Sequence, residues 1–338
     1  MRPSERRERA GSAAGGDPAS AETAASAETA AGENTAASAD TEGADEHLGG
    51  PAIVVARYAG YCYGVERALR IAEKTGAELT PPIYTLGPLI HNPSVVARLA
   101  RRGIAAVDDL DQIGHGTVIV RTHGIDPDVI AAARARGLVV IDATCPFVGI
   151  AHDKANMLRE QGYVPVILGE RDHPEVVGLV AWAGPEAIVV EDADELRSAD
   201  VKGKRVGVVV QTTQTRDNLA RLVSRLAPVA RETLVFNTIC DATGKRQAAA
   251  QELARAVDVV IVVGGRNSAN TTRLASLCRV IQPRTWHIET AAELEGSWLA
   301  GARRVGVTAG ASTPEDEIDA AVTRIRELGG AKRPAGPR

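Results

Sequence analysis

Residues 257–270 read Val-Asp-Val-Val-Ile-Val-Val-Gly-Gly-Arg-Asn-Ser-Ala-Asn, an apolar run that ends in a glycine-rich polar turn. A short continuous apolar run is typical of a strand buried on both faces of a parallel sheet. A glycine-rich turn after such a strand can bring backbone N–H groups to a bound anion. The stretch therefore predicts a buried strand that leads into a polar site.

The same pattern recurs outward in both directions from this stretch. Longer segments rich in Ala, Arg and Leu, with helical character, separate nine short apolar runs. The runs are 53–56, 83–86, 118–120, 139–141, 164–168, 206–210, 234–236, 257–263 and 305–307, with a further edge strand at 188–190. Alternating strands and helices of this kind predict an α/β fold with mostly parallel sheets.

Cysteines follow the first, fourth and seventh of these runs. They are Cys62, Cys145 and Cys240. Open α/β sheets bind ligands at the carboxyl ends of their strands, so equivalent strand ends favour a shared centre. The sequence therefore predicts three related α/β modules, covering residues 50–142, 143–236 and 237–328.

The three cysteines have several chemical interpretations. The chain lacks secretory features, so its thiols are expected to be reduced, and each alone is typically a small buried hydrophobe. No pair has the CxxC spacing of a structural zinc site. Three thiolates could hold a four-iron cluster with one open iron, or a zinc ion with a water, and spacing does not separate the two. Cys278, inside the helical pattern 273–280, is predicted to be a bystander.

The other polar residues at strand ends indicate an anion pocket. Histidines and small polar residues can donate hydrogen bonds to phosphate oxygens. The candidates are His91, His123, His173, Ser268, Asn270 and Ser312. Glu175, two residues after His173, is either a solvated carboxylate at a helix start or a proton donor. The set favours a small phosphorylated ligand.

The charge is unevenly distributed over the 338 residues. Residues 1–49 contain four arginines and ten acidic residues, whereas the rest contains 35 basic and 33 acidic side chains. The alanine-rich acidic segment 1–49 is predicted to be disordered, and 329–338 to be a flexible tail. A net charge of -4, 3% aromatic residues and no apolar run of about 18 residues argue against nucleic-acid binding and membrane spanning.

Nine short motifs, in order and spacing, resemble the 4-hydroxy-3-methylbut-2-enyl diphosphate reductase family, which catalyses the last step of the methylerythritol phosphate route to isoprenoids. The motifs are Tyr61-Cys62-Tyr63-Gly64-Val65, Leu89-Ile90-His91-Asn92, Arg121-Thr122-His123-Gly124, Asp142-Ala143-Thr144-Cys145-Pro146, His173-Pro174-Glu175-Val176, Gln211-Thr212-Thr213, Ile239-Cys240, Asn267-Ser268-Ala269-Asn270 and Thr308-Ala309-Gly310-Ala311-Ser312. The resemblance covers residues 52–325.

The resemblance implies a trefoil of three modules around one 4Fe-4S cluster per chain, held by Cys62, Cys145 and Cys240. It implies that the diphosphate is bound by His91, His123, His173, Asn267, Ser268, Ala269, Asn270 and Ser312. Glu175 and Thr212 would act at the hydroxyl end, with Glu175 supplying protons, and Thr243 also matches a pocket position. The implied reaction is a two-electron reductive dehydroxylation that gives isopentenyl and dimethylallyl diphosphate.

The resemblance also implies a cytoplasmic enzyme that receives electrons from a ferredoxin or flavodoxin. The chain has no GxGxxG fingerprint, which agrees with an external donor. Ala269 stands where members of the family often have Ser, so one hydroxyl contact to the diphosphate is missing. Gly244 and Lys245 also differ from the common pattern.

Three alternatives remain beside this interpretation. A non-catalytic cluster-binding sensor would not need Glu175 and Thr212. A lyase similar to quinolinate synthase would lack the His-Pro-Glu and Asn-Ser-x-Asn motifs. A zinc hydrolase with three thiolate ligands would be colourless after anaerobic purification.

Overall fold

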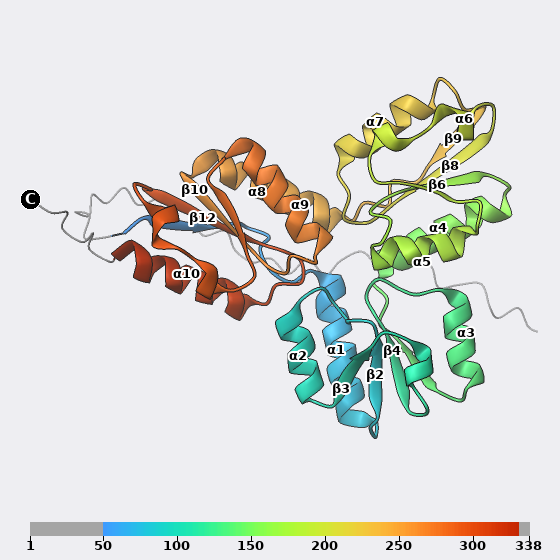
Figure 1. Cartoon of the computed structure of the whole chain (residues 1–338), viewed down its shortest axis with the longest axis horizontal. Helices are drawn as coiled ribbons and strands as arrows, with labels where there is room; N and C mark the ends of the chain where they lie inside the picture. Colours follow the sequence, from blue (N-terminus) through green and yellow to red (C-terminus); the bar gives the residue numbers. More distant parts are fainter. Residues whose placement is uncertain (1–49, 331–338) are drawn as a thin grey trace, which may run out of the picture. The chain divides into compact units, whose positions relative to one another are not determined.

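The computed structural model describes residues 50–330 (Figure 1). The predicted disordered segment 1–49 lies outside the described residues, as does nearly all of the predicted tail 329–338. The described part contains three four-stranded parallel sheets with helices around each of them. This is the α/β fold with three modules that the sequence predicts.

The three sheets share one strand order. Three strands that follow one another in the chain lie in the order second, first, third, and a fourth strand lies beside the third. The 83–142 sheet contains, in order, β3 (Ile104–Val107), β2 (Ile83–Leu86), β4 (Thr117–Val120) and β5 (Val139–Asp142). The 164–235 sheet contains β7 (Ile188–Val190), β6 (Val164–Leu168), β8 (Arg205–Val210) and β9 (Glu232–Val235). The 259–309 sheet contains β11 (Thr285–Ile288), β10 (Val259–Val263), β12 (Arg304–Ala309) and β1 (Ala52–Val55).

The placement of β1 corrects the predicted module boundaries. Residues 50–142 were expected to form one module, yet β1 pairs in parallel with β12, with Ile53 opposite Val305. In Figure 1 this blue strand lies beside the orange and red strands of the 259–309 sheet, at its edge. The sequence of β1 does not indicate its partner, which lies about 250 residues away, because any exposed sheet edge could pair with such a strand.

All nine predicted apolar runs are strands, and so is the predicted edge strand β7. The strands β3 and β11 were not predicted. Both lie at sheet edges, and their sequences, Ile-Ala-Ala-Val and Thr-Trp-His-Ile, do not form the continuous β-branched runs of central strands. Edge strands are only partly covered, so their sequences carry a weaker apolar pattern.

Helices occupy three equivalent positions in the three modules. The first position holds α1 (Tyr63–Glu78), α4 (Pro146–Glu160) and α8 (Asp241–Ala256). The second holds α2 (Pro93–Arg101), α5 (Pro174–Ala183) and α9 (Ala269–Ile281). The third holds α3 (Pro127–Ala135), α7 (Arg216–Leu226) and α10 (Glu315–Gly330), and the short helix α6 (Ser198–Val201) and four 3₁₀ turns complete the chain.

Each sheet is covered on both faces, so each module has two apolar cores. In the 164–235 sheet, for example, Val208 and Leu222 belong to one core and Val209 and Leu158 to the other. Fully burying one such side chain contributes about 1.5–3 kcal/mol. Among residues 50–330, no helix is both long and apolar enough to cross a membrane.

The helices of the first position connect the modules. Each begins directly after a fourth strand, which belongs to one sheet, and then packs on the next sheet. Thus α1 follows β1 but packs on the core of the 83–142 sheet through Val65 and Leu69. The start of each connecting helix is therefore the place where two modules meet.

Candidate functional site

The three predicted cysteines occupy equivalent positions at the N-caps of the connecting helices. Cys62 precedes α1, Cys145 precedes α4 and Cys240 precedes α8. Each backbone N–H donates to a carbonyl of the turn after a third strand, at Ala311 (3.1 Å), Thr122 (2.9 Å) and Thr212 (3.0 Å), respectively. The hydrogen bonds fix the three cysteines in one repeated geometry.

All three cysteines line one cavity, together with the histidines and Glu175. A Cβ atom added to Gly64 would lie 2.5 Å from Sγ of Cys145 and 3.9 Å from Sγ of Cys62. Burial, with smaller contributions from the nearby Cys62 and Cys240, raises the pKa of Cys145 to about 11. None of the three is in a disulfide, whereas the bystander Cys278 is buried in a separate core.

Two kinds of metal centre would hold three thiolates at different separations. A tetrahedral zinc ion with bonds of about 2.3 Å would hold its sulfur atoms about 3.8 Å apart. In an iron–sulfur cluster each thiolate binds a different iron, so the sulfurs stand farther apart.

A buried arginine also indicates an anionic group at this place. Arg246 is only 4% exposed, and it donates to the carbonyl of Gly60 (2.7 Å). Its Nε has no partner, and it makes no ion pair within residues 50–330. Burial lowers its pKa, while the thiol groups of Cys62 and Cys240 act in the opposite direction. A buried cation needs a compensating anion, and a thiolate-held cluster would supply it.

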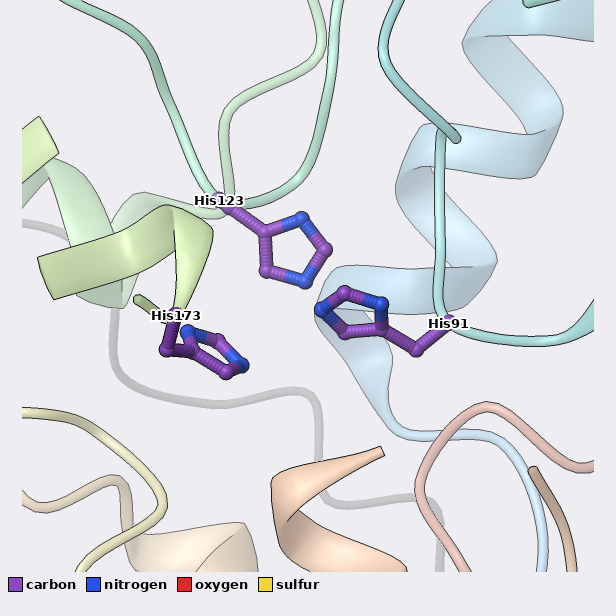
Figure 2. Close-up of side chains that lie close together, drawn as sticks. All are labelled: His91, His123 and His173. Carbon is purple, nitrogen blue, oxygen red and sulfur yellow. The ribbon is translucent and has the colours of Figure 1, made fainter. Parts of the chain in front are cut away.

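The predicted histidines form a compact group in the same cavity (Figure 2). The ring centroids of His91, His123 and His173 lie 4.3, 5.1 and 5.5 Å apart. His91 lies in the loop before α2, His123 in the turn after β4, and His173 is the N-cap of α5. The repeated strand-to-helix turns thus aim three imidazoles at one point.

Burial favours the neutral form of all three imidazoles. Burial, with a smaller contribution from Arg121, lowers the pKa of His91 to about 4. Burial, with smaller contributions from His91 and Arg121, lowers the pKa of His173 to about 3. The pKa of His123 is also well below its usual value, first because of burial. Neither ring nitrogen of His91 has a partner, nor does Nδ1 of His123. These nitrogens are therefore available to a ligand.

The charge around the histidines decides which ligand they suit. Arg121 and Arg273 are the cations that depress the pKa of His173. Arg273 is paired with Glu170 (2.8 Å), whereas Nε of Arg121 is buried without a partner. A metal cation would be repelled by Arg121, but a phosphate would be attracted to it. The group therefore suits an anion.

The serine and asparagine residues expected at the anion site are placed in two ways. Ser268, Ala269, Asn270 and Ser312 line the cavity, and Nδ2 of Asn270 is buried without a partner. Ser312 donates from Oγ to the carbonyl of His91 (2.9 Å). Asn267 is exposed and does not line the cavity, because it precedes the N-cap of α9 and stays in the outer part of the turn.

Glu175 and Thr212 form a buried acidic pair. The carboxylate of Glu175 accepts from the backbone N–H of Thr212 (2.6 Å) and from its Oγ1 (2.8 Å). Burial raises the pKa of Glu175 to about 7, although the two hydrogen bonds from Thr212 lower it. Glu175 therefore exchanges its proton near neutral pH, as a general acid requires.

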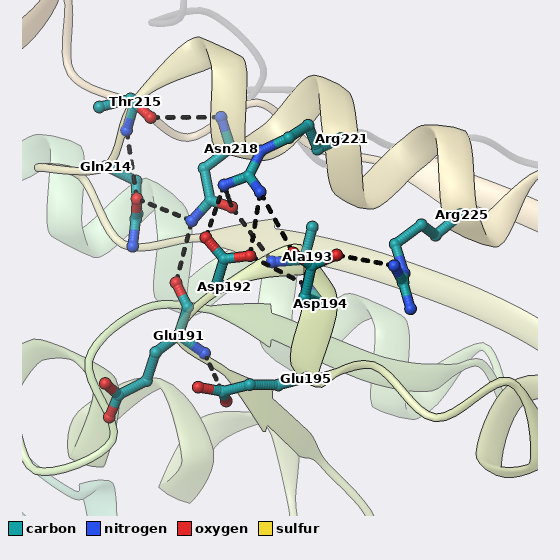
Figure 3. A network of polar contacts seen from close by, with 10 residues as sticks. All are labelled: Glu191, Asp192, Ala193, Asp194, Glu195, Gln214, Thr215, Asn218, Arg221 and Arg225. Carbon is teal, nitrogen blue, oxygen red and sulfur yellow. Dashed lines mark hydrogen bonds and ion pairs between the residues drawn. The ribbon is translucent and has the colours of Figure 1, made fainter.

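A polar network holds the turn that carries Thr212 (Figure 3). Asn218 is buried, and its Nδ2 donates to the carbonyl of Glu191 (2.9 Å) and to Oε1 of Gln214 (3.4 Å). Gln214 closes the turn by donating its N–H to the carbonyl of Gln211 (3.0 Å). The network therefore ties the Thr212 turn to the loop after β7.

Thr213 and Arg246 are among the cavity residues that were not predicted. Thr213 occupies the turn position that is held by His123 in the first module and by Ser312 in the third, and its Oγ1 has no partner. The repeat of the turn could have revealed it. Arg246 lies in a helix whose pattern gives no sign that an arginine is buried there.

Comparisons with known proteins show the family to which the chain is similar. A family model described as LytB protein matches residues 53–326. The 4-hydroxy-3-methylbut-2-enyl diphosphate reductase of Pelobacter propionicus is 49% identical over 82% of this chain and 98% of its own length. The enzyme of that name from Aquifex aeolicus is 43% identical over 82% of this chain and 96% of its own.

Two solved structures are similar to the chain. One is described as (E)-4-hydroxy-3-methyl-but-2-enyl diphosphate reductase, the terminal enzyme of the non-mevalonate pathway, with a TM-score of 0.62, 43% identity and coverage of 82% of this chain and 99% of that one. The other, from Plasmodium falciparum, has a TM-score of 0.75, 30% identity and coverage of 81% and 87%. With the matching family model and these relatives, the three cysteines at equivalent helix starts are those of a chain that belongs to the LytB protein family.

Proposed function

We propose that the chain is a 4-hydroxy-3-methylbut-2-enyl diphosphate reductase that makes isopentenyl and dimethylallyl diphosphate. The observation that carries the proposal is one cavity lined by three thiols, a carboxyl with a pKa near 7 and a group of uncommitted neutral imidazoles. A relative of this name is 49% identical to the chain over 82% of its length. The reaction removes the hydroxyl group with two electrons and two protons, and releases water.

The cofactor in this proposal is one 4Fe-4S cluster per chain, with Cys62, Cys145 and Cys240 as its ligands. The buried Arg246, whose Nε has no partner, supports an anionic thiolate-held group at this place. When bound, the cluster supplies electrons one at a time and an iron with a free coordination position. Arg246 offsets the negative charge of the thiolates and holds the loop before Cys62.

The diphosphate would be bound by the histidine group and the turns beside it. Neutral imidazoles can each donate one N–H, and Arg121 adds a positive charge nearby. Thr213, Ser268, Asn270 and Ser312 supply further donors from the cavity wall. Ala269 has no side-chain donor, but its N–H lies in the first turn of α9, where helix N–H groups are free. Asn267 would support this turn from outside the cavity.

Glu175 would deliver a proton at the hydroxyl end. Thr212 holds the carboxyl in place with two hydrogen bonds and is itself within the cavity wall. Of the two protons consumed, one leaves in water with the hydroxyl oxygen and one is added to the allylic carbon chain. A carboxyl with a pKa near 7 can be recharged from solvent between turnovers.

The electrons would come from a ferredoxin or flavodoxin, and the enzyme would work in the cytoplasm. Four cysteines without a disulfide agree with a reducing compartment.

A second function, a single metal ion on His91, His123 and His173, is favoured by the 4.8 Å grouping of their nitrogens. The nearby Arg121 argues against it.

The deciding experiment is an anaerobic assay with reduced methyl viologen and 4-hydroxy-3-methylbut-2-enyl diphosphate, together with iron and sulfide analysis. We expect turnover and a brown protein with about four irons per chain. Cys145→Ser should abolish turnover and cluster binding, whereas the matched control Cys278→Ser should keep both. A colourless, zinc-containing protein without turnover would refute the proposal.

A further inference from the structure

The exposed aromatic side chains of the chain gather at one place. Aromatic residues make up only 3% of the sequence. Within residues 50–330, three aromatic side chains are exposed: Tyr58 (37%), Tyr63 (60%) and Phe147 (39%). All three line a second cavity, which also includes Arg57 and Lys245. We call these five residues the aromatic face.

The aromatic face adjoins the cysteine site but not the histidine group. Its cavity shares Cys62, Phe147, Ala242 and Arg246 with the cavity of the functional site. Neither Glu175 nor any of the three histidines lines it. A molecule on the aromatic face would therefore touch the residue that bears one thiol and leave the anion pocket free.

The charge of the aromatic face is positive. The only acidic residue in the cavity wall is Asp241, which is paired with Lys245 (2.7 Å). The guanidinium of Arg57 is exposed and lies 5.4 Å from the ring centre of Tyr58. Aromatic residues and arginine are the types enriched in protein interfaces, and positive charge selects an acidic partner.

We propose that the aromatic face is the docking site for an acidic one-electron carrier protein. The inference rests on the proposed function, which requires two electrons from outside the chain. Each docked carrier loses one electron and is oxidised, and the enzyme gains that electron. Two such events, with two protons, convert one allylic alcohol group to a C–H bond and one water. A carrier on the aromatic face leaves the three histidines and Glu175 uncovered, because none of them lines that cavity.

The test compares Arg57→Glu and Tyr63→Ser with two matched controls far along the chain, Arg326→Glu and Val280→Ser, which are exposed and line neither cavity. The probe is an acidic 2Fe-2S ferredoxin. Its binding in the oxidised form is measured by calorimetry on the cluster-loaded full chain at low and high salt, and its KM in the reduced form is measured in turnover. Iron content and the rate with reduced methyl viologen are measured in parallel.

We expect Arg57→Glu to weaken ferredoxin binding and raise its KM by about fivefold or more at low salt, with a smaller effect at high salt. Tyr63→Ser should weaken binding at both salt concentrations. Viologen-driven turnover and iron content should stay at the parent level in both variants. The two controls should bind ferredoxin as the parent does.

An unchanged KM for ferredoxin in both variants, with viologen turnover intact, would overturn the docking site alone. Absence of viologen turnover in the parent would instead refute the proposed function. If deletion of residues 1–49 cancelled the effect of Arg57→Glu, the occupant would be the acidic segment of the chain itself, which would also overturn the proposal.

Discussion

At the scale of the residue, the proposed reaction depends on one carboxyl whose pKa lies near neutral pH. Glu175 is buried, and its two oxygens already accept two hydrogen bonds from Thr212. These bonds stabilise the charged form, yet burial outweighs them and sets the pKa at about 7. The proposed proton donor is thus held in place by Thr212, while its burial disfavours the charged form.

We predict that Glu175→Gln keeps cluster content and substrate binding but lowers kcat by about 10²–10⁴-fold, since the amide cannot give up a proton to the substrate. The parent rate should fall as pH rises through about 7, because Glu175 then loses its proton. The pH profile of single-turnover rates measures both effects. A variant with the parent rate would exclude Glu175 as the acid.

The free energy of unfolding should also depend on pH through Glu175, and the pKa shift fixes the sign of this dependence. The folded-state pKa of Glu175 is raised, so the folded chain holds this proton more tightly than the unfolded chain. The contribution of Glu175 to the free energy of unfolding is therefore complete below the unfolded pKa of about 4.3 and is lost as pH rises towards 7. Glu175→Gln should remove this part of the pH dependence in denaturant titrations.

At the scale of the element, the start of α1 is shaped for the neighbouring thiol. Gly64 lies in the first turn of α1, and a Cβ there would meet Sγ of Cys145 at 2.5 Å. Helix propensity alone favours Ala over Gly by about 1 kcal/mol. Space for the cysteines therefore overrides local stability at this position.

We predict that Gly64→Ala folds but loses most of its bound iron and its turnover, because the thiol of Cys145 must move. Iron and sulfide analysis with circular dichroism distinguishes loss of the cluster from loss of the fold. Gly149→Ala in α4, where a Cβ meets nothing within 4 Å, is the matched control and should keep its iron. Full iron content in Gly64→Ala would contradict the packing argument.

Elements with strong local patterns could be predicted from the sequence, and those with weak ones could not. The central strand β10 is a run of five buried residues, and its sequence predicts it directly. The edge strands β3 and β11 were missed because a half-covered strand needs no such run. Arg246 was missed for a different reason, because its neighbours Cys62 and Gly60 come from a distant part of the chain.

At the scale of the whole molecule, three similar modules are closed into a ring by β1, which supplies the fourth strand of the 259–309 sheet. The equivalence of the cysteines was predictable, since each follows an apolar run. The closure by β1 was not predictable. Residues 52–55 precede Cys62 in the same way that residues 139–142 precede Cys145, and the local sequence does not indicate which sheet residues 52–55 join. The ring also brings Gly50 and Gly329 together, with a Cβ on Gly50 lying 3.7 Å from the carbonyl carbon of Gly329.

We predict that a circular permutant folds and reduces the substrate with viologen as electron donor. In it, Gly330 is joined to Gly50 by a short linker and new ends are opened at the exposed turn around Gly203, which is remote from both cavities. Iron content, circular dichroism and turnover measure the outcome. Deletion of residues 50–56 should instead abolish cluster binding. Failure of the permutant, while a chain of residues 50–330 folds, would argue against closure by β1.

The two ends of the described chain therefore differ as attachment points for a fusion partner or a surface. A tether attached ahead of residue 50 pulls on β1, an outer strand whose one strand partner is β12, and Cys62 follows this strand within a few residues. A tether attached after residue 330 pulls on α10, no residue of which lines the cavity. A fusion partner or surface attachment placed ahead of residue 50 therefore applies force to the part of the fold that carries Cys62. One placed after residue 330 does not.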